Sequence, residues 1–183
     1  MKREIGYLHI SLKDQVFIEF MVKGRHATVL LIGPLAVKIF RKGLEKNAEK
    51  EWNFLNLLKP YGIAPKPYLK IGRIVIMERV EGKPIMDMDE EEIRKAAPQF
   101  LRALAILDRI GVQKEECHRP HKHFLLSEGG VKLIDFERAH FKKKPSNVTQ
   151  FLSFLSKFFD NAIALAKRYE KERDIEKVIS QLK

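Results

Sequence analysis

A short acidic tripeptide, Asp135-Phe136-Glu137, directly follows the β-branched and apolar run from Val131 to Ile134. A carboxylate at the end of a buried strand costs free energy unless a cation meets it. A Mg²⁺ ion bound to a nucleotide is one such cation, because carboxylate oxygens are among its preferred ligands. Asp-Phe pairs also occur by chance, so the residues upstream decide whether Asp135 is a metal ligand.

A second charged residue, Lys38, lies among apolar neighbours in the run from Ala36 to Ile39. On a strand, such a lysine either points to solvent or meets an anion. The helix-forming stretch that follows contains three acids, Glu45, Glu49 and Glu51. A Glu–Lys pair would keep the ammonium group oriented and charged in a partly desolvated site. The alternative is that all three acids are solvated helix charges among neighbouring lysines.

The loop between Lys114 and Leu126 collects further reactive side chains. Its Glu116 can accept a proton from a hydroxyl group. The same loop holds a cysteine and three histidines, Cys117, His118, His121 and His123. Their spacing lacks the paired halves of a structural zinc site, so a solvated or phosphate-contacting cluster is the preferred interpretation over zinc.

The first third of the chain predicts an antiparallel meander that would carry Lys38. Its expected strands cover 16–20, 27–32 and 35–40, with turns at Gly24 and at Gly33-Pro34. Gly24 could let backbone N–H groups approach a phosphate, although a lone glycine commonly marks only a turn. A helix over 44–58, a hairpin over 68–71 and 73–77, and a linker over 78–84 follow.

The second half of the chain is predicted to be mostly helical, with one hairpin. A helical pattern covers 90–110, where Pro98 is expected to interrupt the helix or to begin a second one. Two short strands over 124–126 and 131–134 lead to Asp135. Asn147, with Gln150 three residues later, predicts the N-cap of a closing helical region.

Composition restricts the class of protein. The chain has 183 residues and 45% hydrophobic content, which suggests one domain that can form two lobes. A single cysteine excludes an internal disulfide, and no run is apolar enough for a signal peptide or a membrane span, so a cytoplasmic protein is expected. The net charge of +11 indicates either a solvated lysine-rich surface or a polyanionic partner such as RNA or the ribosome.

Taken in order, these motifs resemble an archaeal predicted serine/threonine protein kinase family that is related to RIO-type and KEOPS-associated kinases. The resemblance covers about 20–160 and rests on 36–38, Glu51, 77–78, 116–126, 134–139 and 145–150. It implies an α+β, protein-kinase-like two-lobe fold within one domain. The N-lobe would cover about 1–80 with an antiparallel sheet, the hinge about 78–84, and a reduced helical C-lobe about 85–183.

The resemblance also implies ATP with Mg²⁺ or Mn²⁺ as cofactors. The γ-phosphate would pass to a serine or threonine hydroxyl, on a protein or small-molecule acceptor, or ATP would instead be hydrolysed as a switch. Lys38, oriented by Glu51, would hold the α- and β-phosphates. The other nucleotide-binding residues would be Gly24 and Val29 of the phosphate loop, the gatekeeper Met77, and the backbone of Glu78 and Val80. Asp135 would bind the metal, and Lys122 would neutralise the γ-phosphate.

The loop over 114–126 departs from the H-R-D-x-x-x-x-N pattern of kinases. One alignment, which we prefer, puts Glu116 at the base position and His123 at the metal-binding Asn position, with two extra residues between them. Another alignment puts His118 at the base position. Glu137 also replaces the glycine of the D-F-G element. These departures leave two alternatives, a nucleotide-binding pseudokinase or scaffold and a basic RNA- or ribosome-associated factor.

Overall fold

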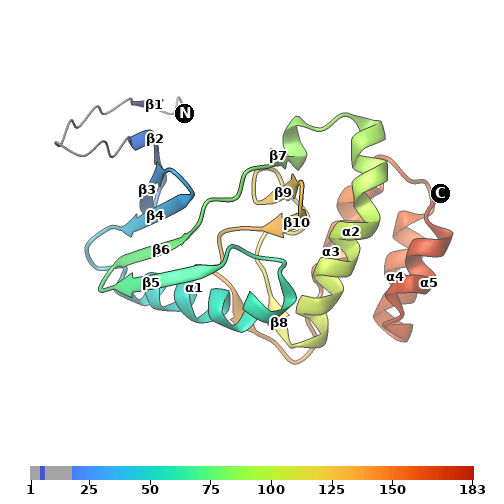
Figure 1. Cartoon of the computed structure of the whole chain (residues 1–183). Helices are drawn as coiled ribbons and strands as arrows, with labels where there is room; N and C mark the ends of the chain where they lie inside the picture. Colours follow the sequence, from blue (N-terminus) through green and yellow to red (C-terminus); the bar gives the residue numbers. More distant parts are fainter. Residues whose placement is uncertain (1–4, 7–17) are drawn as a thin grey trace. The chain divides into compact units, whose positions relative to one another are not determined.

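A computed structural model of the protein describes residues 5–6 and 18–183, which form two compact units (Figure 1). Unit 1 extends to Val80 and also contains Asp135–Glu137. Unit 2 comprises Glu81–Ile134 and Arg138–Lys183. The short return of the chain into unit 1 therefore consists of the acidic tripeptide itself.

Unit 1 is built on a six-stranded antiparallel sheet with the strand order β1-β2-β3-β4-β6-β5. Its strands are β1 (Ile5–Gly6), β2 (Ile18–Lys23), β3 (Ala27–Ile32), β4 (Leu35–Phe40), β5 (Pro67–Ile71) and β6 (Ile74–Glu78). The predicted meander and hairpin are confirmed. The strand predicted over 16–20 begins outside the described residues, and its described part, β2, extends to Lys23.

One helix, α1 (Glu45–Leu58), packs against β5 and β6 of this sheet and continues into the 3₁₀ turn η1 (Lys59–Tyr61) (Figure 1). Phe54, Leu55 and Leu58 are buried on its inner face, and each such side chain contributes about 1.5–3 kcal/mol of hydrophobic free energy. Glu51 lies on the same inner face and is 1% exposed. A carboxylate at that position requires a buried cationic partner.

Unit 2 contains four α-helices among its described residues, α2 (Glu90–Arg109), α3 (Asn147–Leu155), α4 (Ala162–Glu172) and α5 (Ile175–Gln181), and the 3₁₀ turn η2 (Ile85–Asp87). The prediction that Pro98 breaks the first helix is wrong, because α2 runs through it. A capping box between Asp89 and Glu92 starts α2, and buried residues on both sides of Pro98, Ala97 and Phe100, hold it in the core.

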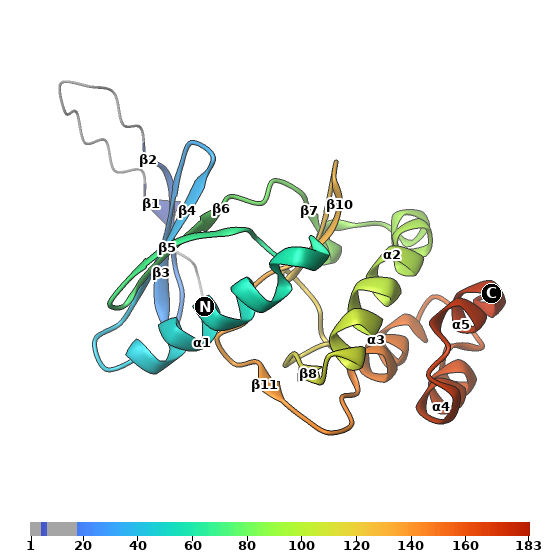
Figure 2. The ribbon, with the colours of Figure 1, turned by 60° about the horizontal axis from the view of Figure 1, so that its bottom comes forward.

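Short strands complete unit 2. They are β7 (Lys83–Pro84), β9 (Phe124–Ser127) and β10 (Gly130–Leu133) in the order β10-β9-β7, and β8 (Val112–Gln113) paired with β11 (His140–Phe141). The core includes an aromatic cluster of Phe100, Phe124 and Phe151, whose ring centroids lie 5.4–5.8 Å apart. Helices α3, α4 and α5 pack consecutively (Figure 2). No helix within the described ranges is long and apolar enough to cross a membrane.

Candidate active site

The pleat of β4 fixes the direction of the Lys38 side chain. Ala36, Lys38 and Phe40 alternate along β4 and are all buried, so they share one face of the sheet. Val29 on β3 and Val75 on β6 are the direct cross-strand neighbours of Lys38. Lys38 is only 7% exposed, which excludes the solvated-lysine alternative.

Three carboxylates of unit 1 converge on the Lys38 ammonium group. Its Nζ lies 3.2 Å from Oε2 of Glu51, 2.8 Å from Oδ1 of Asp135 and 3.3 Å from Oε2 of Glu137. Burial on its own would lower the pKa of Lys38. The carboxylates outweigh burial and raise the pKa above its ordinary value, so the ammonium group stays charged.

The acidic tripeptide reaches Lys38 through an unusual backbone conformation. Asp135 has a φ of 68°, in the left-handed region that aspartate tolerates better than most residues. Phe136 is fully buried and anchors the turn, while Asp135 and Glu137 on either side of it both meet Lys38. Conformations of this kind cost about 1–3 kcal/mol, and they occur preferentially at functional sites.

His26 extends this cluster into the turn between β2 and β3. Its Nδ1 lies 2.5 Å from Oε1 of Glu137. Gly24 in the same turn donates its N–H to the carbonyl of Ala27, and Arg41 binds the carbonyl oxygens of Gly24 and His26. The turn predicted as a phosphate loop is thus held by backbone hydrogen bonds, by the Arg41 side chain and by the contact of His26 with Glu137.

The donor set of this cluster suits a hard divalent cation. One carboxylate oxygen from each of Glu51, Asp135 and Glu137 lies within 4.8 Å of the others. Oxygen ligands of this kind are what Mg²⁺ prefers. Asp135 is the most accessible of the three, with a side chain that is 33% exposed, whereas Glu51 is enclosed beside Lys38. Asp135 and Glu137 therefore fit a metal ion better than Glu51 does.

The remaining residues predicted to bind nucleotide lie on the same sheet or at its edge. Val29 is on β3 beside Lys38, and Met77 is buried on β6 opposite Ala36. Glu78 ends β6, where its N–H donates to the carbonyl of Lys66 and its carboxylate accepts from the Lys66 N–H. The backbone N–H of Glu78 is thus already hydrogen-bonded within the protein. Val80 is the last residue of unit 1 before the chain enters unit 2.

Unit 2 contains Glu116 and Lys122, which were predicted for catalysis, and His123, which was predicted at the second metal position. Glu116 has a φ of 66°, and its carboxylate, in a side chain 48% exposed, accepts a hydrogen bond of 3.0 Å from Arg138. Lys122 and His123 are half-buried in the turn before β9. The His123 backbone bonds Pro120 and Ile134.

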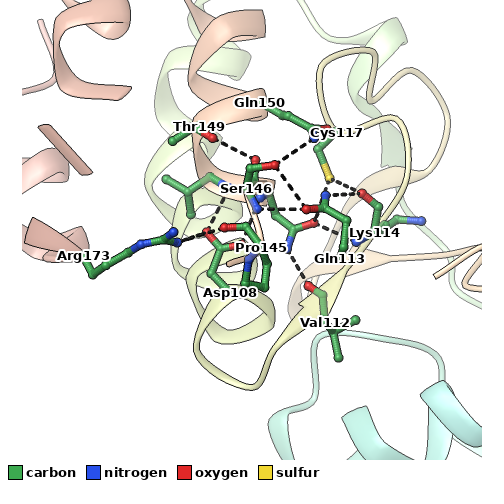
Figure 3. Close-up of polar contacts among 12 residues, drawn as sticks. Asp108, Val112, Gln113, Lys114, Cys117, Pro145, Ser146, Thr149, Gln150 and Arg173 are labelled. Carbon is green, nitrogen blue, oxygen red and sulfur yellow. Dashed lines mark hydrogen bonds and ion pairs between the residues drawn. The ribbon is translucent and has the colours of Figure 1, made fainter. Parts of the chain in front are cut away.

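A buried amide, Asn147, holds the segment that carries Glu116. Asn147 was predicted to be an N-cap, but Ser146 occupies that position and Asn147 is fully buried. Its side chain accepts from the Lys114 N–H and from Gln113 Nε2, and donates to Val112 O and Asp108. Figure 3 shows this network around the labelled Asp108, Val112, Gln113 and Lys114.

The zinc alternative for the same segment has no support. Cys117 is fully buried, and its Sγ lies 3.3 Å from the carbonyl of Lys114. Burial raises the pKa of the Cys117 thiol to about 12, which disfavours the thiolate that zinc needs. Among the described residues, the carboxylates around Lys38 form the only group of ligand atoms spaced for a metal ion.

Sequence reasoning missed three residues of these sites. Glu137 was noted only as a replacement for glycine, yet it binds both Lys38 and His26. Lys114 is 2% exposed, and its Nζ donates to the carbonyl of Ile134, directly before Asp135. The tripeptide's two acids, spaced by one buried phenylalanine, were a usable signal for Glu137. No sequence signal links His26 with Glu137, which are 111 positions apart.

Comparisons with known proteins were consistent in part with the sequence-based expectation. No family model matches the sequence. No curated protein matches it either. Solved structures do match. The Rio2 kinase–ADP/Mg²⁺–phosphoaspartate complex from Chaetomium thermophilum has a TM-score of 0.59 and 14% identity, over 93% of this chain and 63% of that chain.

A second crystal structure of Rio2 kinase from Chaetomium thermophilum gives a TM-score of 0.55 at 14% identity, over 87% of this chain and 61% of that chain. The fold is like that of RIO-type kinases. This chain spans less than two thirds of the length of either neighbour. At 14% identity the likeness concerns the fold alone.

Proposed function

We propose that the protein is an ATP-dependent phosphotransferase of the kinase fold. The observation that carries this proposal is the buried Lys38, paired with Glu51 of the helix and Asp135 after the hairpin. Kinases use a strand lysine, a helix glutamate and a metal-binding aspartate in this order along the chain. A buried lysine surrounded by three carboxylates contributes little net folding stability, because the desolvation cost offsets much of the electrostatic attraction.

In this proposal the two compact units are the lobes of a kinase, and 78–84 is the hinge. Lys38 binds the α- and β-phosphates while Glu51 keeps its ammonium group oriented. Gly24 and Val29 cover the nucleotide, Met77 is the gatekeeper, and the backbone of Glu78 and Val80 contacts the adenine edge. The Glu78 N–H already donates to the carbonyl of Lys66.

Asp135 is the proposed metal ligand, and Glu137 is the residue best placed to assist it. Bound Mg²⁺ or Mn²⁺ would supply neutralisation of phosphate charge. Lys38 now neutralises part of the charge of these acids, so a nucleotide that draws Lys38 to its phosphates leaves Asp135 and Glu137 ready for a cation. Phosphoryl transfer depends mainly on such positioning and charge compensation.

Glu116 remains the proposed base that positions the acceptor hydroxyl, with Lys122 at the γ-phosphate and His123 at the second metal position. A pseudokinase is the second candidate, and the Glu116–Arg138 ion pair favours it. The Arg138 guanidinium competes with an acceptor hydroxyl for the oxygens of this carboxylate.

The proposal also includes the finer expectations from the sequence. These are a serine or threonine hydroxyl as acceptor, on a protein or small molecule, descent from an archaeal family related to KEOPS-associated kinases, and a cytoplasmic location. They also include a contact with RNA or the ribosome through the basic surface.

Incubation with γ-³²P-ATP and Mg²⁺ or Mn²⁺ tests catalysis through autophosphorylation and released phosphate. The wild type is expected to turn over, and Asp135→Asn is expected to be inactive. Glu116→Gln separates the two candidates, since it abolishes turnover only if Glu116 is the base. If the wild type binds nucleotide but shows no turnover with either metal, the phosphotransferase proposal is rejected and the pseudokinase proposal is retained.

A further inference from the structure

The segment from His140 to Lys144 presents an aromatic ring beside a run of lysines. Phe141 is 69% exposed, the highest value among the exposed large hydrophobic residues of the described chain. Lys142, Lys143 and Lys144 follow it directly, and all three are exposed. Phenylalanine side chains are usually buried, so a ring with this exposure is unusual.

The backbone of this segment is fixed at both ends, within unit 2. His140 and Phe141 form β11, which pairs with Gln113 and Val112 of β8. The Lys142 N–H then donates to the carbonyl of Gly111. At the other end Pro145 is buried, and its carbonyl accepts a 3.0 Å hydrogen bond from Arg173, as Figure 3 shows. A ligand would therefore meet side chains on an ordered backbone, which lowers the entropic cost of binding.

A cavity of about 670 Å³ opens beside the lysines, between α2 and the α4–α5 connection. Five cationic side chains line it, Arg102, Arg109, Lys143, Lys144 and Arg173. Two of them are engaged, since Arg102 binds Glu176 in a bidentate pair and Arg173 lies 3.5 Å from Asp108.

The other three cations of the cavity are available to a ligand. Arg109, Lys143 and Lys144 make no ion pair with any residue in the described part of the chain, and Lys142 adds a fourth such cation next to them. The acids that line the cavity are Asp108 and Glu176, which are paired with Arg173 and Arg102, and Glu170. The unpaired charge is thus positive, and the wall between the cations includes the apolar Ile106 and Ile175.

We propose that Phe141, Lys142–Lys144 and Arg109 form a binding surface for single-stranded nucleic acid. Such surfaces combine cations along the phosphate backbone with aromatic rings on which bases stack. Here Phe141 would stack one base, and the lysines and Arg109 would bind the neighbouring phosphates. The cavity is within the size range of small-molecule sites and can admit one nucleotide unit.

The geometry favours this partner over a membrane surface. A membrane-binding face requires several apolar side chains on one side of an element, and this segment exposes one ring among lysines. The surface is also distinct from the Lys38 cluster, because all of its residues belong to unit 2. The proposal therefore stands or falls independently of phosphoryl transfer.

Fluorescence anisotropy with labelled oligouridylate and oligothymidylate of about twelve nucleotides tests the surface, because single-strand sites span roughly 4–16 nucleotides. The full chain is titrated without ATP at several salt concentrations. Phe141→Ala is expected to weaken binding about tenfold, as the loss of one stacked base does, and Phe141→Leu should fail to restore it.

The double variant Lys143→Gln/Lys144→Gln is expected to reduce the steepness of log K against log salt by about 1.4, since each phosphate contact contributes about 0.7 for a single strand. The matched control is Lys167→Gln/Lys171→Gln, which removes the same charge from exposed positions of α4 outside the cavity. Circular dichroism melting confirms that each variant is folded.

Three results would overturn the proposal. The first is an absence of oligonucleotide binding at low salt. The second is equal weakening by the two lysine pairs, which would indicate a diffuse effect of net charge. The third is binding to a phosphorylated peptide or to anionic vesicles with full sensitivity to Phe141→Ala while oligonucleotides show none.

Discussion

Each unit of the molecule contains a buried polar cluster, and the two clusters differ in kind. In unit 1, Lys38 meets the carboxylates of Glu51, Asp135 and Glu137. In unit 2, Asn147 uses its amide to join Asp108 to the backbone of Val112 and Lys114. The first cluster is ionic and has more acids than bases. The second is a hydrogen-bonded network between segments that are distant in the sequence.

Under the proposed function, the first cluster binds ligand and the second supports the fold. Buried charge is costly unless every group is compensated, so a surplus of carboxylates indicates that a further cation or polar ligand completes the site. In the second cluster the Asn147 amide satisfies backbone groups, and the one carboxylate, Asp108, lies 3.5 Å from Arg173. We therefore expect changes in unit 1 to affect ligand binding, and changes around Asn147 to affect mainly stability.

The largest effect is expected for Lys38→Met. Removing the ammonium group leaves adjacent carboxylates uncompensated, and breaking a buried ion pair in this way costs about 3–5 kcal/mol of unfolding free energy. Nucleotide binding and any turnover should be lost as well. Urea denaturation and ATP titration measure the two effects.

The double variant Lys38→Met/Glu51→Gln serves as its control. Neutralising Glu51, which is 1% exposed, removes one uncompensated charge and should restore part of the stability without restoring binding. If the single variant were as stable as the wild type, the ionic description of unit 1 would be wrong.

Asn147→Ala is expected to destabilise unit 2 by about 3 kcal/mol, because several buried donors and acceptors lose their partner. The effect should appear in urea denaturation. ATP affinity measured well below the unfolding transition should change less than threefold. Ser153→Ala, on the exposed face of the same helix, is the matched control and should change stability by less than about 0.5 kcal/mol.

The thiol of Cys117 reports on the Asn147 network. Because burial raises its pKa to about 12, the native thiol should stay protonated and react slowly with Ellman's reagent up to pH 9, while the urea-unfolded chain reacts fast. Unfolding releases this proton above pH 9.0, the ordinary pKa, so the Cys117 contribution to the free energy of unfolding falls as the pH rises from 9.0 toward 12. Fast reaction of the native Cys117 thiol with Ellman's reagent at pH 8 would contradict the burial of this thiol in the Asn147 network.

The smallest effect is expected for His26→Ala. The His26 side chain is 34% exposed, and half-exposed pairs of this kind contribute less than about 1 kcal/mol. ATP affinity should fall by a factor of about two to five, because the turn at Gly24 loses its contact with Glu137. His26→Gln retains a hydrogen-bond donor, so its ATP affinity should lie between those of the wild type and His26→Ala. An unchanged ATP affinity in both variants would show that His26 does not belong to the site.

Much of unit 1 could be predicted because its signals are local. Strands β3 and β4 have the predicted bounds, since alternating or continuous apolar runs and the Gly33 turn specify them. The choice of Glu51 as the partner of Lys38 came from the resemblance to kinases, in which a strand lysine pairs with a helix glutamate, and the structure contains this pair. The alternative of a solvated helix acid is wrong for Glu51, which is buried.

Unit 2 was harder to predict because its decisive contacts join distant segments. The two-residue strands β8 and β11 have no periodicity of their own and exist through their pairing. Asn147 follows the local rule for an N-cap, but its amide is used by β8 and Asp108 instead. Pro98 breaks the propensity rule because tertiary packing of α2 outweighs the lost hydrogen bond.

Isothermal titration of the folded protein with ATP and Mg²⁺ tests the assignment of the Lys38 cluster most directly. Wild type is expected to bind one nucleotide, Asp135→Asn to lose the Mg²⁺-dependent part of the affinity, and Lys38→Met to bind at least tenfold more weakly, since a desolvated charge contact to phosphate is worth about 1.5–3 kcal/mol. No binding by folded wild type, or equal affinity in all three proteins, would contradict the assignment.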